Sequence, residues 1–286
     1  MGSAARALYA LVALLSALAT SSVADAQADT GPVLLSNEIS GTEQCGPHQV
    51  FWDNSPMPTF QQEGQARLRA TLPNGQPIFD VHWQLGPGER LIALWCADLL
   101  GDGRQAIAYE RFSGGAHCCF AATVLLIEPG AVHLLDVDLG NGGLVEPRQI
   151  DGVGPLELPT TSDVFAYFDD LAYAASPVLP LVLAYDGTRY VEATRRFPDL
   201  LADEARQAQV ELREVVARQT VVGGSRFDYE EQVGMALRLY GLHVLLGDAD
   251  QALPGLKALV APPVAEWLDV NAQPAAEAMA RVYHNQ

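Results

Sequence analysis

The residues best suited to chemistry lie in one short motif, Ser-Gly-Gly-Ala-His-Cys-Cys-Phe, at residues 113–120. Glycines before a histidine and two cysteines would place reactive side chains at the mouth of a β-hairpin. Three chemical roles are open. One cysteine could be a nucleophile with His117 or His133 as its base. The histidine and both cysteines could hold a soft metal ion, or Cys118 and Cys119 could form a redox-active vicinal disulfide.

We favour a structural role for these cysteines. The chain has four, Cys45, Cys96, Cys118 and Cys119, and an even count in an exported protein predicts disulfides. Neighbouring residues on a strand point to opposite faces, so we expect Cys118 and Cys119 to bond to different partners. Two pairings with Cys45 and Cys96 stay open. The same geometry separates His117 from Cys118, and the motif lacks both a cysteine-protease signature and zinc-type spacing.

A second candidate group is acidic. Asp163, Asp169 and Asp170 lie around an aromatic-rich stretch. Paired carboxylates can serve glycoside hydrolysis, and Tyr167 and Tyr173 beside them could stack on a sugar. This group predicts, as an alternative function, a hydrolase of polysaccharide or peptidoglycan. Solvated charges at a turn and aromatic residues in the core are the simpler interpretation.

The first 26 residues predict a signal peptide. Arg6 supplies a positive charge, residues 7–19 form an apolar stretch too short to span a bilayer comfortably, and Ala24-Asp25-Ala26 offers a cleavage site before Gln27. Beyond Gln27 no run is long and apolar enough for a transmembrane anchor. We therefore expect an exported protein, periplasmic or extracellular.

Composition limits the partners. The 286 residues include 35 acidic and 17 basic residues, for a net charge of −18. A surface this negative repels nucleic acid and anionic membranes and suits cationic partners. The simpler interpretation, which we prefer, is that acidic residues keep an exported protein soluble. The chain contains no P-loop, dinucleotide fingerprint, nucleophile elbow or His-Glu-x-x-His motif. These observations favour a binding role over a common catalytic one.

Turn signals recur at a near-constant interval. Asn74-Gly75, Pro129-Gly130 and Asp186-Gly187 each separate two apolar runs, as in a β-hairpin. The turn glycines are 55 and 57 residues apart, which suggests stacked or radially arranged β-units. Apolar runs at residues 91–95, 106–109, 120–127 and 132–137 predict an antiparallel meander. Upstream, we expect an irregular segment with one strand near residues 49–52.

A glycine-rich loop begins at Asp98 and reads Asp-Leu-Leu-Gly-Asp-Gly, ending just after Asp102. It leads into a strand, and residues 149–158 form a poorer copy. The loop resembles the calcium-type loop of FG-GAP/VCBS repeats, the repeats of integrin-like β-propellers, and the resemblance covers about residues 65–197. It implies propeller-like β-units and a possible calcium site at Asp98 and Asp102. Leu100 replaces a polar ligand of the family pattern, and tight turns built by the glycines are the structural alternative.

The pattern changes from strand to helix after Pro198. Residues 199–219 are amphipathic, and Asp228 with Glu231 predicts a capping box for a second helix that ends at Gly247. Further short helices are expected at residues 248–259, 263–269 and 274–283. The junction around Gly247 resembles that of a tetratricopeptide repeat, which implies a helical hairpin. So few β-units cannot close a ring, so the β-region is either an incomplete, sandwich-like version of the repeat or has a covered open edge. The helices, packed on it or appended to it, are the candidate cover.

The sequence thus predicts an α+β protein: antiparallel β-meander, propeller-like or sandwich repeats, followed by a C-terminal α-helical region. The expected parts are a signal peptide (1–26), an irregular lead-in (27–64), a β-repeat domain (65–197) and a helical region (198–286). By analogy with other repeat β-proteins, the expected function is an exported non-enzymatic binding or interaction module. Its partner would be an unknown protein or glycan. Besides the hydrolase, a structural envelope protein with self-associating helices is the other alternative.

Overall fold

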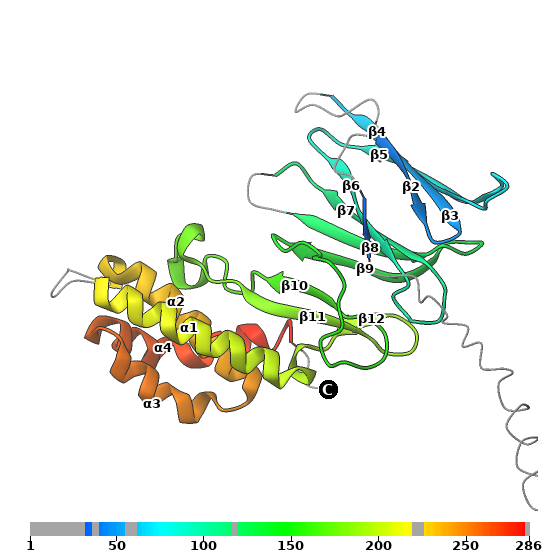
Figure 1. Cartoon of the computed structure of the whole chain (residues 1–286). Helices are drawn as coiled ribbons and strands as arrows, with labels where there is room; N and C mark the ends of the chain where they lie inside the picture. The colour runs from blue at the N-terminus through cyan, green and yellow to red at the C-terminus, as the bar shows by residue number, and fades with distance from the viewer. Residues whose placement is uncertain (1–31, 36–39, 55–61, 116–118, 219–225, 284–286) are drawn as a thin grey trace, which may run out of the picture. The chain divides into compact units, whose positions relative to one another are not determined.

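The computed structural model describes residues 32–35, 40–54, 62–115, 119–218 and 226–283 (Figure 1). The predicted signal peptide, His117 and Cys118 lie outside these ranges. Within these ranges, three antiparallel sheets precede four helices, which confirms the predicted α+β class.

The first sheet is a four-stranded meander. Its strands follow one another in sequence order: β2 (Ser40–Cys45), β3 (His48–Asp53), β4 (Gly64–Thr71) and β5 (Pro77–Leu85). Residues 40–54 therefore contribute a hairpin to this sheet, where an irregular segment with one strand was expected. The strand β2 is hidden in the sequence because its residues are polar and mostly exposed until Cys45. Its pairing with β3, rather than an apolar pattern, makes it a strand.

The second sheet has five strands in the order β1-β6-β7-β8-β9. The last four form the predicted meander. The strands are β1 (Val33–Leu34), β6 (Arg90–Ala97), β7 (Ala106–Phe112), β8 (Phe120–Leu126) and β9 (Val132–Gly140).

The third sheet contains β10 (Leu158–Ser162), β11 (Leu179–Tyr185) and β12 (Tyr190–Glu192). The three predicted hairpins are confirmed, and each is the last hairpin of its own sheet. Their turns hold Gly75, Gly130 and Gly187 at φ of +82°, +93° and +102°, a backbone region that glycine adopts at little cost. The near-constant spacing in the sequence thus reflects one hairpin turn per sheet.

The second sheet packs on both faces. Neighbouring residues enter different cores: Cys96 and Ile107 join the core shared with the first sheet, whereas Trp95 and Ala108 join the core shared with the third sheet and the helices. Pleating sends successive side chains to opposite faces, so a strand buried on both sides is apolar throughout. This burial explains the long apolar runs in this part of the sequence.

The helices share that second core with the sheets. They are α1 (Pro198–Arg218), α2 (Glu230–Leu246), α3 (Ala249–Leu259) and α4 (Pro262–Met279). Apolar residues line several sides of α2, as in a helix surrounded by other elements. The Tyr283 hydroxyl, just after α4, donates to the Pro180 carbonyl of β11 at 3.0 Å. The helical region thus packs on the third sheet.

Two helix predictions are wrong in detail. The segment from residue 262 to 279 is one helix that continues through Pro274, because Val264, Trp267, Ala275 and Met279 keep one buried face across it. The predicted start of α2 is also wrong, since its N-cap residue is Tyr229 rather than Asp228. Asp228 lies in a preceding 3-10 turn, η4 (Arg226–Tyr229), which leads the chain into α2.

The disulfide pairing also differs from the expectation. Cys45 is bonded to Cys96 with a Cα–Cα distance of 5.9 Å, so neither is available to the Cys-Cys motif. The register explains why. Cys96 pairs with Ile107, whereas the motif begins after Phe112 at the far end of β7, about 20 Å along the strands. A disulfide spans at most about 7 Å between Cα atoms. Cys119 is itself disulfide-bonded, and none of the described cysteines is free.

Buried carboxylates hold the connection between β9 and β10. Glu110 on β7 is 5% exposed and accepts a hydrogen bond from the Leu144 N–H group at 2.5 Å. Glu157 is 4% exposed and accepts one from the Ile150 N–H group at 2.7 Å. Burial raises the pKa of both carboxyl groups.

This arrangement predicts a pH-dependent effect of Glu110→Gln, a substitution that keeps an oxygen acceptor and removes the buried charge. Because burial raises the pKa of Glu110 in the folded state, the folded protein binds the proton more tightly than the unfolded chain. The charge therefore costs stability above the raised pKa, and this cost disappears as the pH falls through it. We expect the free energy of unfolding of the variant to exceed that of wild type by about 1 kcal/mol near pH 8. That advantage should shrink towards about pH 5.

Urea unfolding across this pH range measures the effect. Glu146→Gln removes an exposed carboxylate from the same connection and serves as the control. Stability curves of Glu110→Gln and wild type that stay parallel at all pH values would contradict the prediction.

Candidate functional site

The two carboxylates of the calcium-type loop are engaged within the loop. Asp98 accepts hydrogen bonds from the N–H groups of Asp102 and Gly103, at 3.2 and 2.8 Å. Asp102 forms an ion pair with Arg104 at 2.6 Å. In the described part of the chain, no group of three or more His, Cys, Asp or Glu side chains could hold a metal ion. The loop geometry is that of a tight turn, and its Leu99 carbonyl accepts from the Leu156 N–H group of the second glycine-rich loop.

The Ser-Gly-Gly-Ala-His-Cys-Cys-Phe motif connects β7 to β8. Ser113 and Cys119 close its turn: the Ser113 N–H group donates to the Cys119 carbonyl at 3.0 Å, and the Cys119 N–H group donates to Ser113 Oγ at 2.8 Å. A Cβ atom at Gly114 would lie 2.7 Å from the Gly88 backbone, so this turn packs directly on the β5–β6 connection. Because His117 and Cys118 lie outside the described residues, the nucleophile, metal and redox roles stay predictions.

The three predicted acidic residues have different surroundings. Asp163 accepts a hydrogen bond from Asn141 Nδ2 at 2.8 Å and thereby holds the β9–β10 connection. Asp169 accepts one from Trp267 Nε1 of α4 at 2.6 Å. Asp170 is exposed. Asp163 and Asp169 thus tie separate parts of the chain together.

The backbone around Asp169 is strained. Tyr167, Asp169 and Asp170 have φ of +56°, +46° and +60°, a left-handed conformation that side chains disfavour. Each such residue costs about 1–3 kcal/mol and persists only where its surroundings enforce it. Here the Trp267 hydrogen bond and a 3.0 Å bond from the Tyr167 N–H group to Ser176 Oγ fix the segment. The result is a tyrosine side chain held at the surface, with Tyr167 56% exposed.

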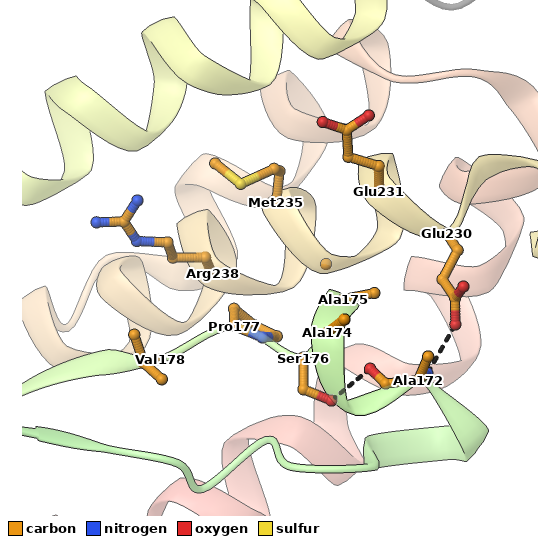
Figure 2. Close-up of a pocket in the computed structure, with 11 residues that line it drawn as sticks. Ala172, Ala174, Ala175, Ser176, Pro177, Val178, Glu230, Glu231, Met235 and Arg238 are labelled. Carbon is orange, nitrogen blue, oxygen red and sulfur yellow. Dashed lines mark hydrogen bonds between the residues drawn. The ribbon is translucent and has the colours of Figure 1, made fainter. Parts of the chain in front are cut away.

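Next to this segment lies a pocket of about 720 Å³ (Figure 2). Figure 2 shows Met235 and Arg238 of α2 on one side and Ser176, Pro177 and Val178 on the other. Most of the lining is small and apolar, with a few polar groups. The remaining lining residues are Ala172, Ala174, Ala175, Glu230, Glu231 and Gly234.

Two contacts fix the walls of this pocket. A Cβ atom at Gly234 would lie 2.1 Å from the Ala175 carbonyl oxygen, so the backbone of α2 approaches the 3-10 turn η2 (Tyr173–Ala175) directly. Beside it, the Ala172 N–H group donates to Glu230 Oε1 at 2.7 Å (Figure 2). The pocket could not be predicted from local patterns, because two segments about 60 positions apart in the chain form it. A glycine inside an apolar helix was the one available signal.

The charge around the pocket is negative. Arg238 donates to Glu211 and Glu204 of α1 at 2.7 and 2.9 Å, so two carboxylates surround its guanidinium. Its Nε atom is buried and has no hydrogen-bond partner among the described residues. Glu231 forms a 2.9 Å ion pair with Arg218. Together with Glu230, the carboxylates outnumber the guanidinium groups, and such a site attracts a cation.

None of the predicted acidic residues lines this pocket. Asp169 and Asp170 belong to the neighbouring strained segment, which is joined to the pocket through Ser176. Asp163 precedes that segment and contacts Asn141 instead. The structure thus brings the predicted region next to a cavity without placing those carboxylates in it.

Comparisons of the chain with protein-family models, with curated proteins and with solved structures found no match. None of the described helices is long and apolar enough to cross a membrane. The described part of the chain thus defines an α+β protein with three antiparallel sheets and a four-helix region. Its pocket lies where α2 meets the chain between β10 and β11.

The close contact of α2 predicts a large effect of Gly234→Ala. The added methyl group would meet the Ala175 carbonyl oxygen and push α2 away from η2, at a cost of about 2–3 kcal/mol in the free energy of unfolding. Gly255→Ala in α3 is the matched control, because nothing lies within 4 Å of its added Cβ atom. Alanine there should stabilise the helix by up to about 1 kcal/mol. Equal effects of both substitutions in urea unfolding would contradict this account.

Proposed function

We propose that this protein is an exported, non-enzymatic binding module whose pocket between residues 172–178 and α2 takes a ligand with an apolar body and a cationic group. One observation carries the proposal: a cavity of about 720 Å³ lined mainly by small apolar side chains and bordered by glutamates. Binding sites for compact ligands have this size and composition. A lysine or arginine side chain of a peptide, or a small amine, has the required chemistry.

Several features support binding over catalysis. Asp98, Asp102, Asp163 and Asp169 each accept hydrogen bonds from groups that hold the fold, as described above. The glutamates at the pocket likewise hold structural partners. Export is supported by the predicted signal peptide and by the Cys45–Cys96 disulfide, which suits an oxidising compartment.

The proposal can be tested with arrays of short peptides graded from basic to acidic. The labelled protein should retain peptides that combine lysine or arginine with apolar residues. Val178→Trp fills the pocket from its rim and should weaken this binding about tenfold. Val145→Trp is the control, because both valines are about half exposed, at 49% and 52%, and Val145 lies outside the pocket. The proposal would be refuted if binding did not depend on the charge of the peptide, or if the affinity fell equally in both variants.

A second candidate function is glycan recognition at Tyr167 and Tyr173. Their ring centroids lie 5.5 Å apart, and the strained backbone holds Tyr167 at the surface beside Asp169 and Asp170. Aromatic faces with neighbouring carboxylates suit stacking on a sugar and hydrogen bonding to its hydroxyl groups. A glycan array tests this candidate: retention lost in Tyr167→Ala would support it. The predicted hydrolase would be favoured if the protein released products from a retained glycan and if the double variant Asp169→Asn with Asp170→Asn abolished this release.

A further inference from the structure

A second surface lies at the edges of two sheets. The strand β9 ends the five-stranded sheet and β12 ends the three-stranded sheet (Figure 1). Residues of both strands line a hollow of about 540 Å³. Six consecutive residues of β9, 133–138, line this hollow, whereas β11 contributes only the alternate residues Leu181 and Leu183. Successive side chains of a strand point to opposite faces, so consecutive lining residues mark an edge and alternate ones mark a face. The hollow therefore follows the free edge of β9 across the face of β11.

The two sides of this edge differ in chemistry. Val137 packs against the core shared with the third sheet, and Leu181, Leu183 and Tyr190 supply an apolar floor on the same side. Asp136 and Asp138 alternate with Val137 and are exposed.

The carboxylates on the other side have no cationic partner across the sheet. Their neighbours on β8 are Thr123 and Ala121, neither of which carries a charge. Among the described residues, neither Asp136 nor Asp138 forms an ion pair. A strand added at this edge would face Asp136 and Asp138 with two of its residues, and the residue between them would point to the apolar floor. Opposite charges favour such cross-strand pairs, so the added strand should alternate basic and apolar residues.

We propose that the free edge of β9 binds an extended, basic segment of a partner polypeptide as an additional strand. Main-chain hydrogen bonds to the edge would give affinity, and the acidic and apolar sides would select the alternating pattern. A second copy of this chain is a poor occupant, because pairing β9 with β9 would bring Asp136 and Asp138 towards the same acids. Acidic side chains on an edge oppose self-association in this way. The surface shares no lining residue with the pocket of Figure 2, so the two can be tested separately.

The probe is a blocked heptapeptide of alternating lysine and valine, titrated into the full chain. We expect saturable binding that weakens as salt rises, together with slower amide hydrogen exchange in residues 132–140. A peptide of the same composition in scrambled order and one with glutamate in place of lysine should bind at least about tenfold more weakly. Equal binding of the scrambled peptide would overturn the proposal, as would protection of a different edge.

Protein variants give the matching test. Asp136→Asn with Asp138→Asn removes two charges, and an asparagine oxygen at position 138 can still accept from the Gly140 N–H group, as Asp138 does at 3.0 Å. We expect about a tenfold loss of heptapeptide affinity. The control, Glu146→Gln with Glu214→Gln, removes the same charge from exposed positions outside the hollow. Equal losses in both double variants would overturn the proposal, as would sedimentation showing a dimer formed through β9.

Discussion

Removing the Cys45–Cys96 disulfide, by replacing both cysteines with alanine, is expected to lower the free energy of unfolding by about 4 kcal/mol. The bond closes a loop over a sequence separation of 51 residues, and a loop of this length greatly restricts the unfolded chain. The bond joins the end of β2 to β6 and so links the first sheet to the second. Urea unfolding of the double variant beside wild type, both without reductant, measures the loss.

The loss of stability should first affect the sheets that the disulfide joins. The first sheet and the inner face of the second share one core, and the helices contribute nothing to it. We therefore expect faster hydrogen exchange in β2 to β5 of the double variant, with α1 to α4 unchanged below the unfolding transition. Reductant provides the control: it should destabilise wild type more than the variant, because the variant has already lost this bond. Uniformly faster exchange throughout the described chain would contradict a local role.

The hairpins could be predicted because their signals are local. An Asn-Gly, Pro-Gly or Asp-Gly pair between apolar runs determines a turn through the backbone preferences of a few residues. The same holds for α2, whose end at Gly247 was predicted from the glycine alone. The strand β2 escaped prediction because its conformation depends on pairing with β3 and on the bond at Cys45, and its own residues carry no apolar alternation.

The disulfide and the candidate site depend on distant contacts. The bond between Cys45 and Cys96 depends on how the first two sheets stack. The alternation of residues within a strand does not predict that stacking. The pocket exists because Gly234 lets α2 approach Ala175, a contact between segments separated by most of the third sheet and by α1. The left-handed conformation of Tyr167 is likewise enforced from outside, by Ser176. Composition reveals which residues can react or bind, but packing decides which of them meet.

Truncation after Phe197 should abolish the cooperative unfolding transition, because the helices are part of the same core as the third sheet. Leu158, Leu179 and Leu183 of that sheet pack in one cluster with residues of α1, α2 and α4. Each large apolar side chain that loses its cover costs about 1.5–3 kcal/mol, and several lose it together. Three such side chains together cost about 4.5–9 kcal/mol, which is comparable with the 5–15 kcal/mol that stabilises a typical domain. We expect the truncated chain to bind a hydrophobic dye and to melt without a sharp transition.

Co-expression of residues 198–286 as a separate chain is the decisive control for the truncation. If the helices complete a shared core, the second chain should bind the first and restore a cooperative transition. The contact between Tyr283 and Pro180 should then protect β11 from hydrogen exchange as it does in the intact protein. A truncated chain that melts sharply by itself would instead show that residues before 198 form an independent domain. The helices would then be an appended module. A role of the helices in self-association alone would require that arrangement.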